Sequence, residues 1–159
     1  IYTTYPAPTY VATPGNRATD SRQYGLELFA NARPTDRLRV DAAYTWLHAR
    51  ESGVVEVRRP KSIASLSVTA ISTDKRLSGT LSLRYNGQQT DVAYTDPSYR
   101  PVRVKLKAYT LANANLDYRL TPKVAVFGRI ENLFDQDYEE VFSYATPGRA
   151  GYAGVRLAF

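Results

Sequence analysis

The 159-residue sequence contains no cysteine and no methionine, and its single histidine is His48. Without cysteine the chain can form no disulfide scaffold, zinc-thiolate site, iron–sulfur cluster or thiol nucleophile. Apolar runs are also short, and none approaches the roughly 18 consecutive apolar residues of a membrane-spanning helix. These absences exclude a helical membrane protein. They do not exclude a β-barrel, because only every second residue of a barrel strand faces lipid.

The excess of positive charge is modest. The sequence has 21 Lys and Arg against 15 Asp and Glu, which gives a formal net charge of +6. No recognition helix or platform of aromatic and basic residues accompanies this excess, so we expect no nucleic-acid partner. The chain opens with Ile1 and Tyr2 instead of Met, and we expect it to be part of a longer protein. Tyrosine is abundant, with 13 residues, and its amphipathic ring suits interfaces.

Apolar and polar residues alternate along most of the chain. Between Leu77 and Gln88 the odd positions are Leu, Gly or Tyr, and the even positions are Ser, Thr, Arg, Asn or Gln. Successive side chains of a strand point to opposite faces, so this pattern predicts a strand with one apolar and one polar face. Six other segments show the same division, with Ala43 and Phe127 as exceptions. The seven predicted strands are 24–32, 38–46, 63–71, 77–88, 108–120, 123–131 and 149–159.

Connector lengths alternate as well. Short connectors at 34–36, 72–76 and 121–122 are followed in turn by long ones at 51–61, 91–107 and 135–148. Tight turns at one end and long loops at the other are typical of outer-membrane barrels. A soluble β-sandwich that binds carbohydrate would also alternate and stays open as a second interpretation. The apolar face is rich in Ala, Gly and Leu, with aromatic residues toward the strand ends, which favours lipid as its neighbour.

Catalysis has little support in the sequence. His48 is predicted on the same side of its strand as Tyr44 and Trp46, and no nucleophile or metal partner is patterned near it. A barrel-type protease or lipase would need paired carboxylates or a Ser–His pair at one rim. We therefore expect no enzyme and no cofactor.

An acidic group follows the sixth predicted strand. Its members are Asp135, Asp137, Glu139 and Glu140. An Asp-x-Asp spacing can bind calcium, but the Gly and the distal Glu of a calcium loop are absent. Asp side chains in turns commonly accept hydrogen bonds from their own backbone. We therefore predict turn hydrogen bonds and no metal site here.

One block carries a family resemblance. Residues 130–138, Ile-Glu-Asn-Leu-Phe-Asp-Gln-Asp-Tyr, resemble the final region of TonB-dependent outer-membrane receptors, in which Asn-Leu-Phe-Asp-x-x-Tyr ends the penultimate strand. The motif residues are Asn132, Leu133, Phe134, Asp135 and Tyr138. The segment 144–149 and the last strand are similar to the same family's ending. The resemblance extends over most of residues 20–159, through Gly-Leu-Glu-Leu at 25–28, the Pro34 turn, Arg59-Pro60 and Tyr85.

The resemblance implies an all-β antiparallel meander, the last seven or so strands of a 22-stranded transmembrane β-barrel in the bacterial outer membrane. Residues 1–159 would be a C-terminal segment of the barrel domain, with the N-terminal plug and the TonB box missing. The ending at 144–149 is most similar to that of vitamin B12 (cobalamin) receptors, and haem and siderophore receptors end in related ways. The implied function is uptake of cobalamin, or of a ferric siderophore or haem, driven by the TonB complex acting through the missing part.

The resemblance also suggests ligand contact through the outer loops, where aromatic rings and flexible cations suit a corrinoid or a chelate. The candidates are Tyr94, Tyr99, Arg100, Phe142 and Tyr144. The last strand carries Val155, Leu157 and Phe159 at alternate positions, which resembles the signal that the barrel-assembly machinery reads by strand pairing.

The charged residues of the polar faces are predicted to form a hydrated, charge-paired inner wall that would contact a plug. They are Arg39, Arg84, Asp117, Arg119, Arg129, Glu131 and Arg156. The basic cluster at Arg58, Arg59 and Lys61 follows an outer loop, and lipopolysaccharide phosphate is a reasonable partner for cations at that rim.

Overall fold

In the computed structural model, residues 2–15 and 19–159 are described, and within them the chain forms twelve strands and no helix. The strands are β1 Tyr2–Thr4, β2 Thr13–Gly15, β3 Ser21–Thr35, β4 Leu38–Glu51, β5 Val54–Val55, β6 Ser62–Ile71, β7 Leu77–Asn86, β8 Gln89–Ala93, β9 Val102–Leu106, β10 Tyr109–Thr121, β11 Val124–Glu131 and β12 Ala150–Leu157. Among the described residues there is no helix that could cross a membrane.

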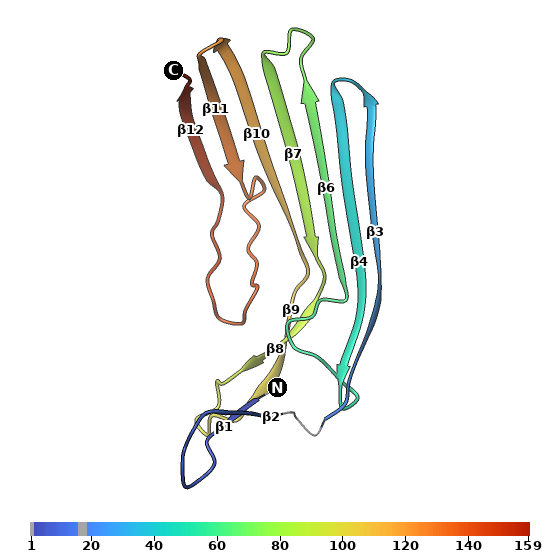
Figure 1. Ribbon diagram of the computed structural model, residues 1–159, viewed down its shortest axis with the longest axis vertical. Coiled ribbons are helices and arrows are strands. Elements are labelled where there is room, and N and C mark those ends of the chain that lie inside the picture. Colours follow the sequence, from blue (N-terminus) through green and yellow to red (C-terminus); the bar gives the residue numbers. More distant parts are fainter. Residues whose placement is uncertain (1, 16–18) are drawn as a thin grey trace.

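Seven long strands form one antiparallel sheet in chain order, β3-β4-β6-β7-β10-β11-β12 (Figure 1). The predicted seven-stranded meander is therefore confirmed, and the predicted strand 63–71, for example, differs from β6 by one residue. β4 is longer than predicted and runs to Glu51, because it continues to pair with β3 and with the short β5 beyond Trp46.

The two ends of the sheet differ as the connector lengths predicted. The β3–β4, β6–β7 and β10–β11 turns are short and lie together at the top of Figure 1, where the chain also ends. The longer connections between β4 and β6, β7 and β10, and β11 and β12 lie at the opposite end. In an outer-membrane barrel these ends are the periplasmic and extracellular ends, respectively.

Two small hairpins were not predicted. The segment 91–107, expected as a long loop, is largely the β8–β9 hairpin, and β1 pairs with β2 near the N-terminus. Each β8 or β9 strand has only five residues, too few for periodicity to distinguish it from a loop. This hairpin and the start of β10 contain most of the fully buried side chains, among them Asp91, Ala93 and Leu106.

The pairing register aligns residues of one kind across the sheet. One row of cross-strand partners is Val40, Val68, Leu81, Ala114 and Ile130. The adjacent row, one residue along each strand, is Arg39, Thr69, Thr80, Asn115 and Arg129. The first row lies on the apolar face and the second on the polar face, so the alternation predicted for each strand is preserved across the whole sheet.

The apolar face is not covered by a second sheet within the described part of the chain, and the seven strands form a single layer (Figure 1). Leu28, Leu116 and Val155 on this face are more than half exposed. A soluble β-sandwich would bury such residues between two sheets, so that interpretation is wrong. A contiguous apolar surface of this kind requires an apolar environment, and hydrocarbon provides one.

The assignment of the apolar and polar faces can be tested directly. In the complete membrane protein, Leu83→Arg places a cation on the apolar face at mid-strand and is expected to lower the free energy of folding into lipid by about 2–4 kcal/mol. Its sequence neighbour Ser82 faces the other side, and Ser82→Arg is expected to cost less than about 1 kcal/mol. Urea titration of vesicle-folded protein, followed by the electrophoretic shift on heating, measures both. Equal losses in the two variants would contradict the assigned faces.

Candidate functional site

A buried carboxylate holds the long loops together at the extracellular end. Asp91 in β8 is completely buried, and its Oδ1 accepts hydrogen bonds from Arg58 Nε and from its neighbour's amide, Val92 N, both at 2.8 Å. Its Oδ2 accepts a hydrogen bond from Phe142 N at 2.7 Å. These donors belong to the β4–β6 loop, to β8 itself and to the β11–β12 loop. Asp91 therefore connects three segments that are far apart in the sequence.

The same network sets the charge state of Asp91, which lies beyond the membrane-spanning strands. Burial alone raises the pKa of this carboxyl, but the amides of Phe142 and Val92 and the Arg58 guanidinium outweigh burial. The pKa of Asp91 therefore lies below its ordinary value, and the group is ionised at neutral pH.

A second set of contacts docks the β11–β12 loop against the sheet. The Gln89 side chain donates to the Glu140 carbonyl oxygen at 2.9 Å, and Tyr109 Oη donates to the Glu140 carboxylate at 2.9 Å. Arg84, on the polar face of β7, lies 3.6 Å from the same carboxylate. The loop is thus held over the polar side of the sheet, as an extracellular loop that partly covers a pore would be.

The motif residue Asn132 turns the chain at the end of β11. It is buried and has a positive φ of 47°, a conformation that Asn tolerates better than most residues. Its amide nitrogen Nδ2 donates to the Gln136 carbonyl oxygen at 3.0 Å, and its Oδ1 accepts from Gln136 N at 2.8 Å. Its backbone amide donates to Asn113 Oδ1. One Asn side chain therefore shapes the first turn of the loop.

Acidic side chains of this loop accept hydrogen bonds from backbone amides of the protein. Asp135 Oδ1 accepts from Arg149 N at 2.7 Å, and the Glu139 carboxylate accepts from Ser143 N at 3.2 Å. Of the turn hydrogen bonds predicted for the group, the one from Ser143 to Glu139 is local, whereas Asp135 accepts from an amide across the loop. Among the described residues, no group of three or more His, Asp or Glu side chains could hold a metal ion.

An open hollow of about 680 Å³ lies between the β9–β10 junction and the β11–β12 loop. Lys105, Lys107 and Tyr109 line one side of it. Tyr138 and Tyr144 line the other, and the rings of Tyr109 and Tyr138 are 4.5 Å apart. Cations and aromatic rings of this kind suit a large polar ligand, although Asp137 and Glu139 at the same hollow balance the lysine charges.

The five predicted ligand residues fall into two places. Tyr144 and Phe142 lie in the β11–β12 loop, where Tyr144 lines the hollow and is 70% exposed and the Phe142 amide donates to Asp91. Tyr94, Tyr99 and Arg100 lie between β8 and β9, at the tip of the hairpin. The sequence alone does not indicate Lys105, Lys107 and Tyr109, because no local sequence pattern shows that β9 and the β11–β12 loop meet. Ligand contact by any of these residues stays a prediction.

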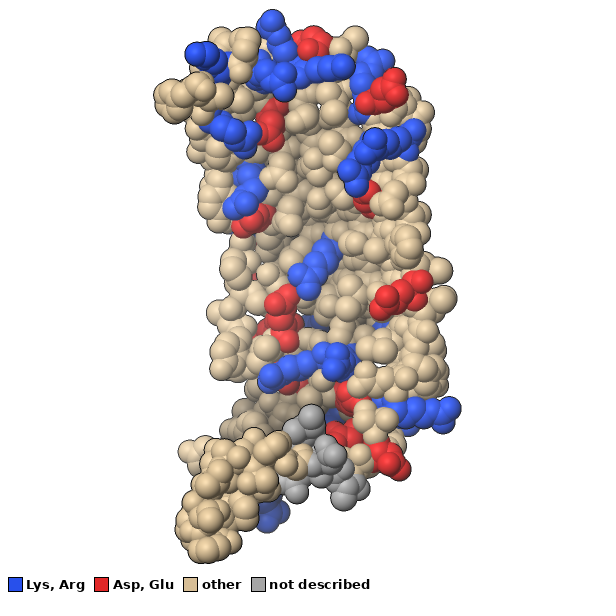
Figure 2. Space-filling view, viewed as in Figure 1, with Lys and Arg blue, Asp and Glu red and all other residues tan. Residues whose placement is uncertain are grey.

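The polar face carries the predicted charge-paired wall. Arg39 contacts Asp41 at 2.7 Å, Arg129 contacts Glu131 at 3.2 Å, and Thr69 and Thr80 hydrogen-bond at 2.9 Å across strands. In Figure 2, acidic and basic side chains lie in neighbouring groups along the height of this face, and Lys and Arg gather at the end with the short turns. Phe127 interrupts the pattern, and its ring packs over Gly154 and under the Arg156 guanidinium.

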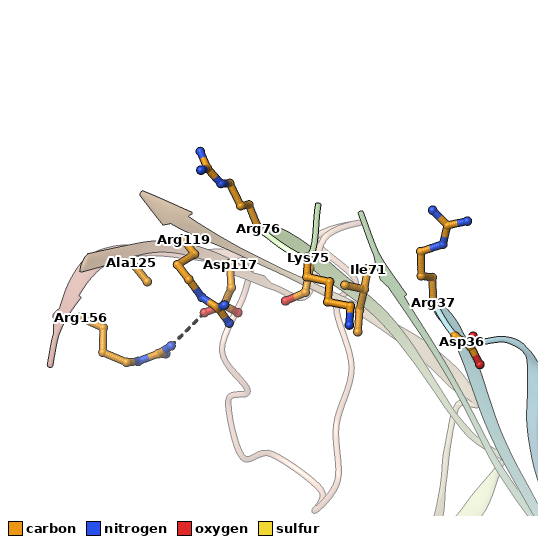
Figure 3. Close-up of a pocket in the computed structure, with 10 residues that line it drawn as sticks. Asp36, Arg37, Ile71, Lys75, Arg76, Asp117, Arg119, Ala125 and Arg156 are labelled. Carbon is orange, nitrogen blue, oxygen red and sulfur yellow. Dashed lines mark hydrogen bonds and ion pairs between the residues drawn. The ribbon is translucent and has the colours of Figure 1, made fainter. Parts of the chain in front are cut away.

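The short-turn end of this face forms a second hollow, of about 720 Å³. In Figure 3, Arg119, Arg156 and Lys75 extend to the side on which Asp117 lies, whereas Arg37 and Arg76 extend away from it. Within the described residues, Asp117 pairs only with Arg156, at 3.2 Å. The hollow therefore has an excess of cations toward the barrel interior. Its contact with a plug stays a prediction.

The apolar face has an aromatic cluster near its extracellular end. The Tyr24 ring stacks on His48 with centroids 4.7 Å apart and meets Trp46 edge-on at 5.9 Å. This agrees with the interfacial role predicted for His48. Gly25 permits the close pairing of these strands, because a Cβ there would lie 2.3 Å from the Trp46 carbonyl oxygen.

The single antiparallel sheet, with a lipid-facing side, a polar side and braced loops at one end, defines a segment of an outer-membrane barrel wall. The sequence model of the family described as "TonB dependent receptor-like, beta-barrel" matches residues 1–133. The chain belongs to this family, and its location is the bacterial outer membrane.

Individual relatives agree with this assignment. The vitamin B12 transporter BtuB of Photobacterium profundum is 33% identical over 137 residues, which are 85% of this chain and 21% of that protein. The iron-regulated outer membrane virulence protein of Vibrio cholerae is 26% identical over 160 residues, 93% of this chain and 23% of that protein. The chain thus spans about a fifth of the length of these relatives.

Solved structures show the same fold. The ferripyoverdine receptor of the Pseudomonas aeruginosa outer membrane superimposes with a TM-score of 0.78 at 20% identity, covering 97% of this chain and 21% of that one. The ferric-catecholate import receptor Fiu of Escherichia coli gives 0.73 at 18% identity, covering 99% of this chain and 23% of that one.

The Asp91 network predicts acid-sensitive loop docking. A carboxyl whose pKa is lowered by folding stabilises the fold at pH values above its unfolded pKa of about 3.9, and this stabilisation is lost as the pH falls through the lower folded-state pKa. Asp91→Asn removes one acceptor at every pH and is expected to destabilise the docked loop at pH 7 by about 1–3 kcal/mol. Hydrogen exchange of residues 136–146 in the complete receptor measures this.

Asp96→Asn is the matched control, because among the described residues the Asp96 side chain accepts only from Ser98, in the exposed hairpin turn. It should leave exchange in residues 136–146 unchanged. Loop protection that is insensitive both to Asp91→Asn and to acidification below about pH 4 would show that Asp91 does not hold the loop.

Proposed function

We propose that the protein is an outer-membrane receptor that takes up cobalamin through a TonB-driven barrel, and that a ferric siderophore or haem is the second candidate ligand. The observation that carries this proposal is the membership of the chain in the TonB-dependent receptor barrel family. The 33% identity to a vitamin B12 transporter favours cobalamin. The iron-regulated relative and the siderophore receptors with the same fold support the second candidate.

The geometry is consistent with binding and passage instead of covalent chemistry. The loops that would contact a ligand are braced by Asp91 and Glu140 at the extracellular end. The polar face supplies a hydrated wall below them. In a 22-stranded barrel such a wall surrounds a plugged lumen. Nucleic acid is not part of this proposal.

The remaining partners would meet other parts of the molecule. The TonB complex would engage an N-terminal part outside residues 1–159. The barrel-assembly machinery would read Val155, Leu157 and Phe159, which lie at the end of β12, a strand that pairs only with β11 among the described strands. An unpaired strand edge cannot stay in hydrocarbon, so both β12 and β3 require further strands to close the barrel.

The ligand assignment is tested with the complete receptor in outer-membrane vesicles of a strain without other cobalamin and siderophore receptors. We expect saturable binding of radiolabelled cyanocobalamin, and growth on limiting cobalamin that depends on TonB. Binding of a ferric chelate without cobalamin binding would select the second candidate. Binding of neither would contradict the proposed function.

Tyr144 gives a residue-level prediction. If the 680 Å³ hollow holds the ligand, Tyr144→Ala should weaken binding about tenfold, because an exposed aromatic ring at the centre of an interface contributes more than its neighbours. Tyr144→Phe keeps the ring and should bind like the wild type. The double variant Tyr94→Ala and Tyr99→Ala tests the hairpin tip independently. Unchanged affinity in Tyr144→Ala would remove this hollow from the ligand site.

A further inference from the structure

Two arginines face each other directly at the extracellular end of the first sheet pair. Arg22 of β3 and Arg50 of β4 are cross-strand partners in the register that also pairs Tyr24 with His48. Like charges in directly opposite positions repel and destabilise a sheet. An anion between or above the two guanidinium groups would remove this repulsion.

The chain itself supplies no such anion within its described residues. The Arg22 guanidinium lies over the Tyr24 ring, 5.5 Å from its centroid, and Arg50 Nη1 donates to the Gly53 carbonyl oxygen at 2.9 Å. Neither arginine belongs to an ion pair of the described part of the chain. The nearby Glu56 carboxylate accepts from Ser21 and Gln23, one residue to either side of Arg22 and therefore on the opposite face.

The position of the pair relative to the membrane follows from the aromatic residues beside it. Arg22 and Arg50 share the lipid-facing side with Tyr24, His48 and Trp46, whose rings contact one another. Tyr and Trp rings on this side of a barrel mark the level of the lipid headgroups. The arginine pair lies one two-residue repeat farther out, on the side of the long loops, and so reaches the headgroups of the outer leaflet.

We propose that Arg22 and Arg50 together bind a phosphate group of lipopolysaccharide, the phosphorylated glycolipid of the outer leaflet. A guanidinium matches a phosphate with two parallel hydrogen bonds, and two guanidinium groups on neighbouring strands, about 5 Å apart at their backbones, can hold one phosphate between them. The bound phosphate removes the repulsion between the arginines. The Tyr24 ring beneath Arg22 keeps its guanidinium at this level.

The proposal places the lipid site away from the cluster at Arg58, Arg59 and Lys61, where contact with lipopolysaccharide stays a prediction. Arg58 donates to the buried Asp91, and Arg59 lies 3.7 Å from Glu56. Both of these cations therefore have an acidic partner within the loops. Arg22 and Arg50 face lipid and belong to no ion pair of the described residues, and they are adjacent in space although 28 positions separate them in the sequence.

The test uses the complete receptor purified from the outer membrane. Native mass spectrometry counts lipopolysaccharide bound per receptor, and only protein that shows the heat-dependent mobility shift of a folded barrel is scored. The double variant Arg22→Gln and Arg50→Gln should retain on the order of tenfold less lipopolysaccharide than the wild type. The double variant with Lys at both positions keeps the charge and should retain an intermediate amount.

The matched control removes the same charge at the other end of the sheet, by Arg76→Gln and Lys123→Gln, and should retain wild-type amounts. If the double Gln variant folds poorly, Arg50→Gln alone is scored and should lose a smaller but measurable fraction. Wild-type retention in the Gln variants, or equal loss in the control, would overturn the proposal. Displacement of the lipid by millimolar inorganic phosphate would show a free-phosphate site and would also overturn it.

Discussion

An unpaired backbone N–H or C=O group in hydrocarbon costs several kcal/mol, and this constraint governs the structure. It requires each membrane strand to pair along its length, and the seven long strands of this chain do so in one uninterrupted antiparallel order. The alternation of apolar and polar residues fixes the register, because a shift of one residue would turn Leu81 and Leu83 toward water and Ser82 and Arg84 toward lipid. The backbone constraint also leaves β3 and β12 in need of neighbours.

The two faces of the sheet carry different kinds of side chain on the same strands. The apolar face relies on exposed aliphatic side chains and on rings near its ends, and its described strand residues between Leu38 and Trp46 include no charge on that side. The polar face instead places charges of both signs next to one another, as in Arg39 with Asp41 and Arg156 with Asp117. Exposed pairs of this kind contribute little stability, and they leave this face polar along its height.

The large side chain that is fully buried in the described chain, Asp91, lies beyond the membrane-spanning strands. Asp91 is buried completely and is joined to residues 33 and 51 positions away. Removing one partner of a buried carboxylate is destabilising, so the three loops depend on one another through Asp91. At the extracellular end of β3 and β4, the alternation of side chains places two kinds of polar group on opposite faces of the sheet. Glu56 and Gln23 join on the side of the pore, and Arg22 and Arg50 face the outer leaflet.

The seven long strands, their two faces and the two kinds of connection could be predicted from the sequence. These follow from a period of two and from turn residues, which are local properties of each segment. The family motif at 132–138 was also readable, although the hydrogen bonds that make Asn132 indispensable to the turn were not. Which loop residues meet could not be predicted, because it depends on the folded arrangement of the loops. The β8–β9 hairpin, the burial of Asp91, the commitment of Arg58 and the opposition of Arg22 and Arg50 all depend on contacts between segments distant in the chain, and no local pattern encodes such contacts.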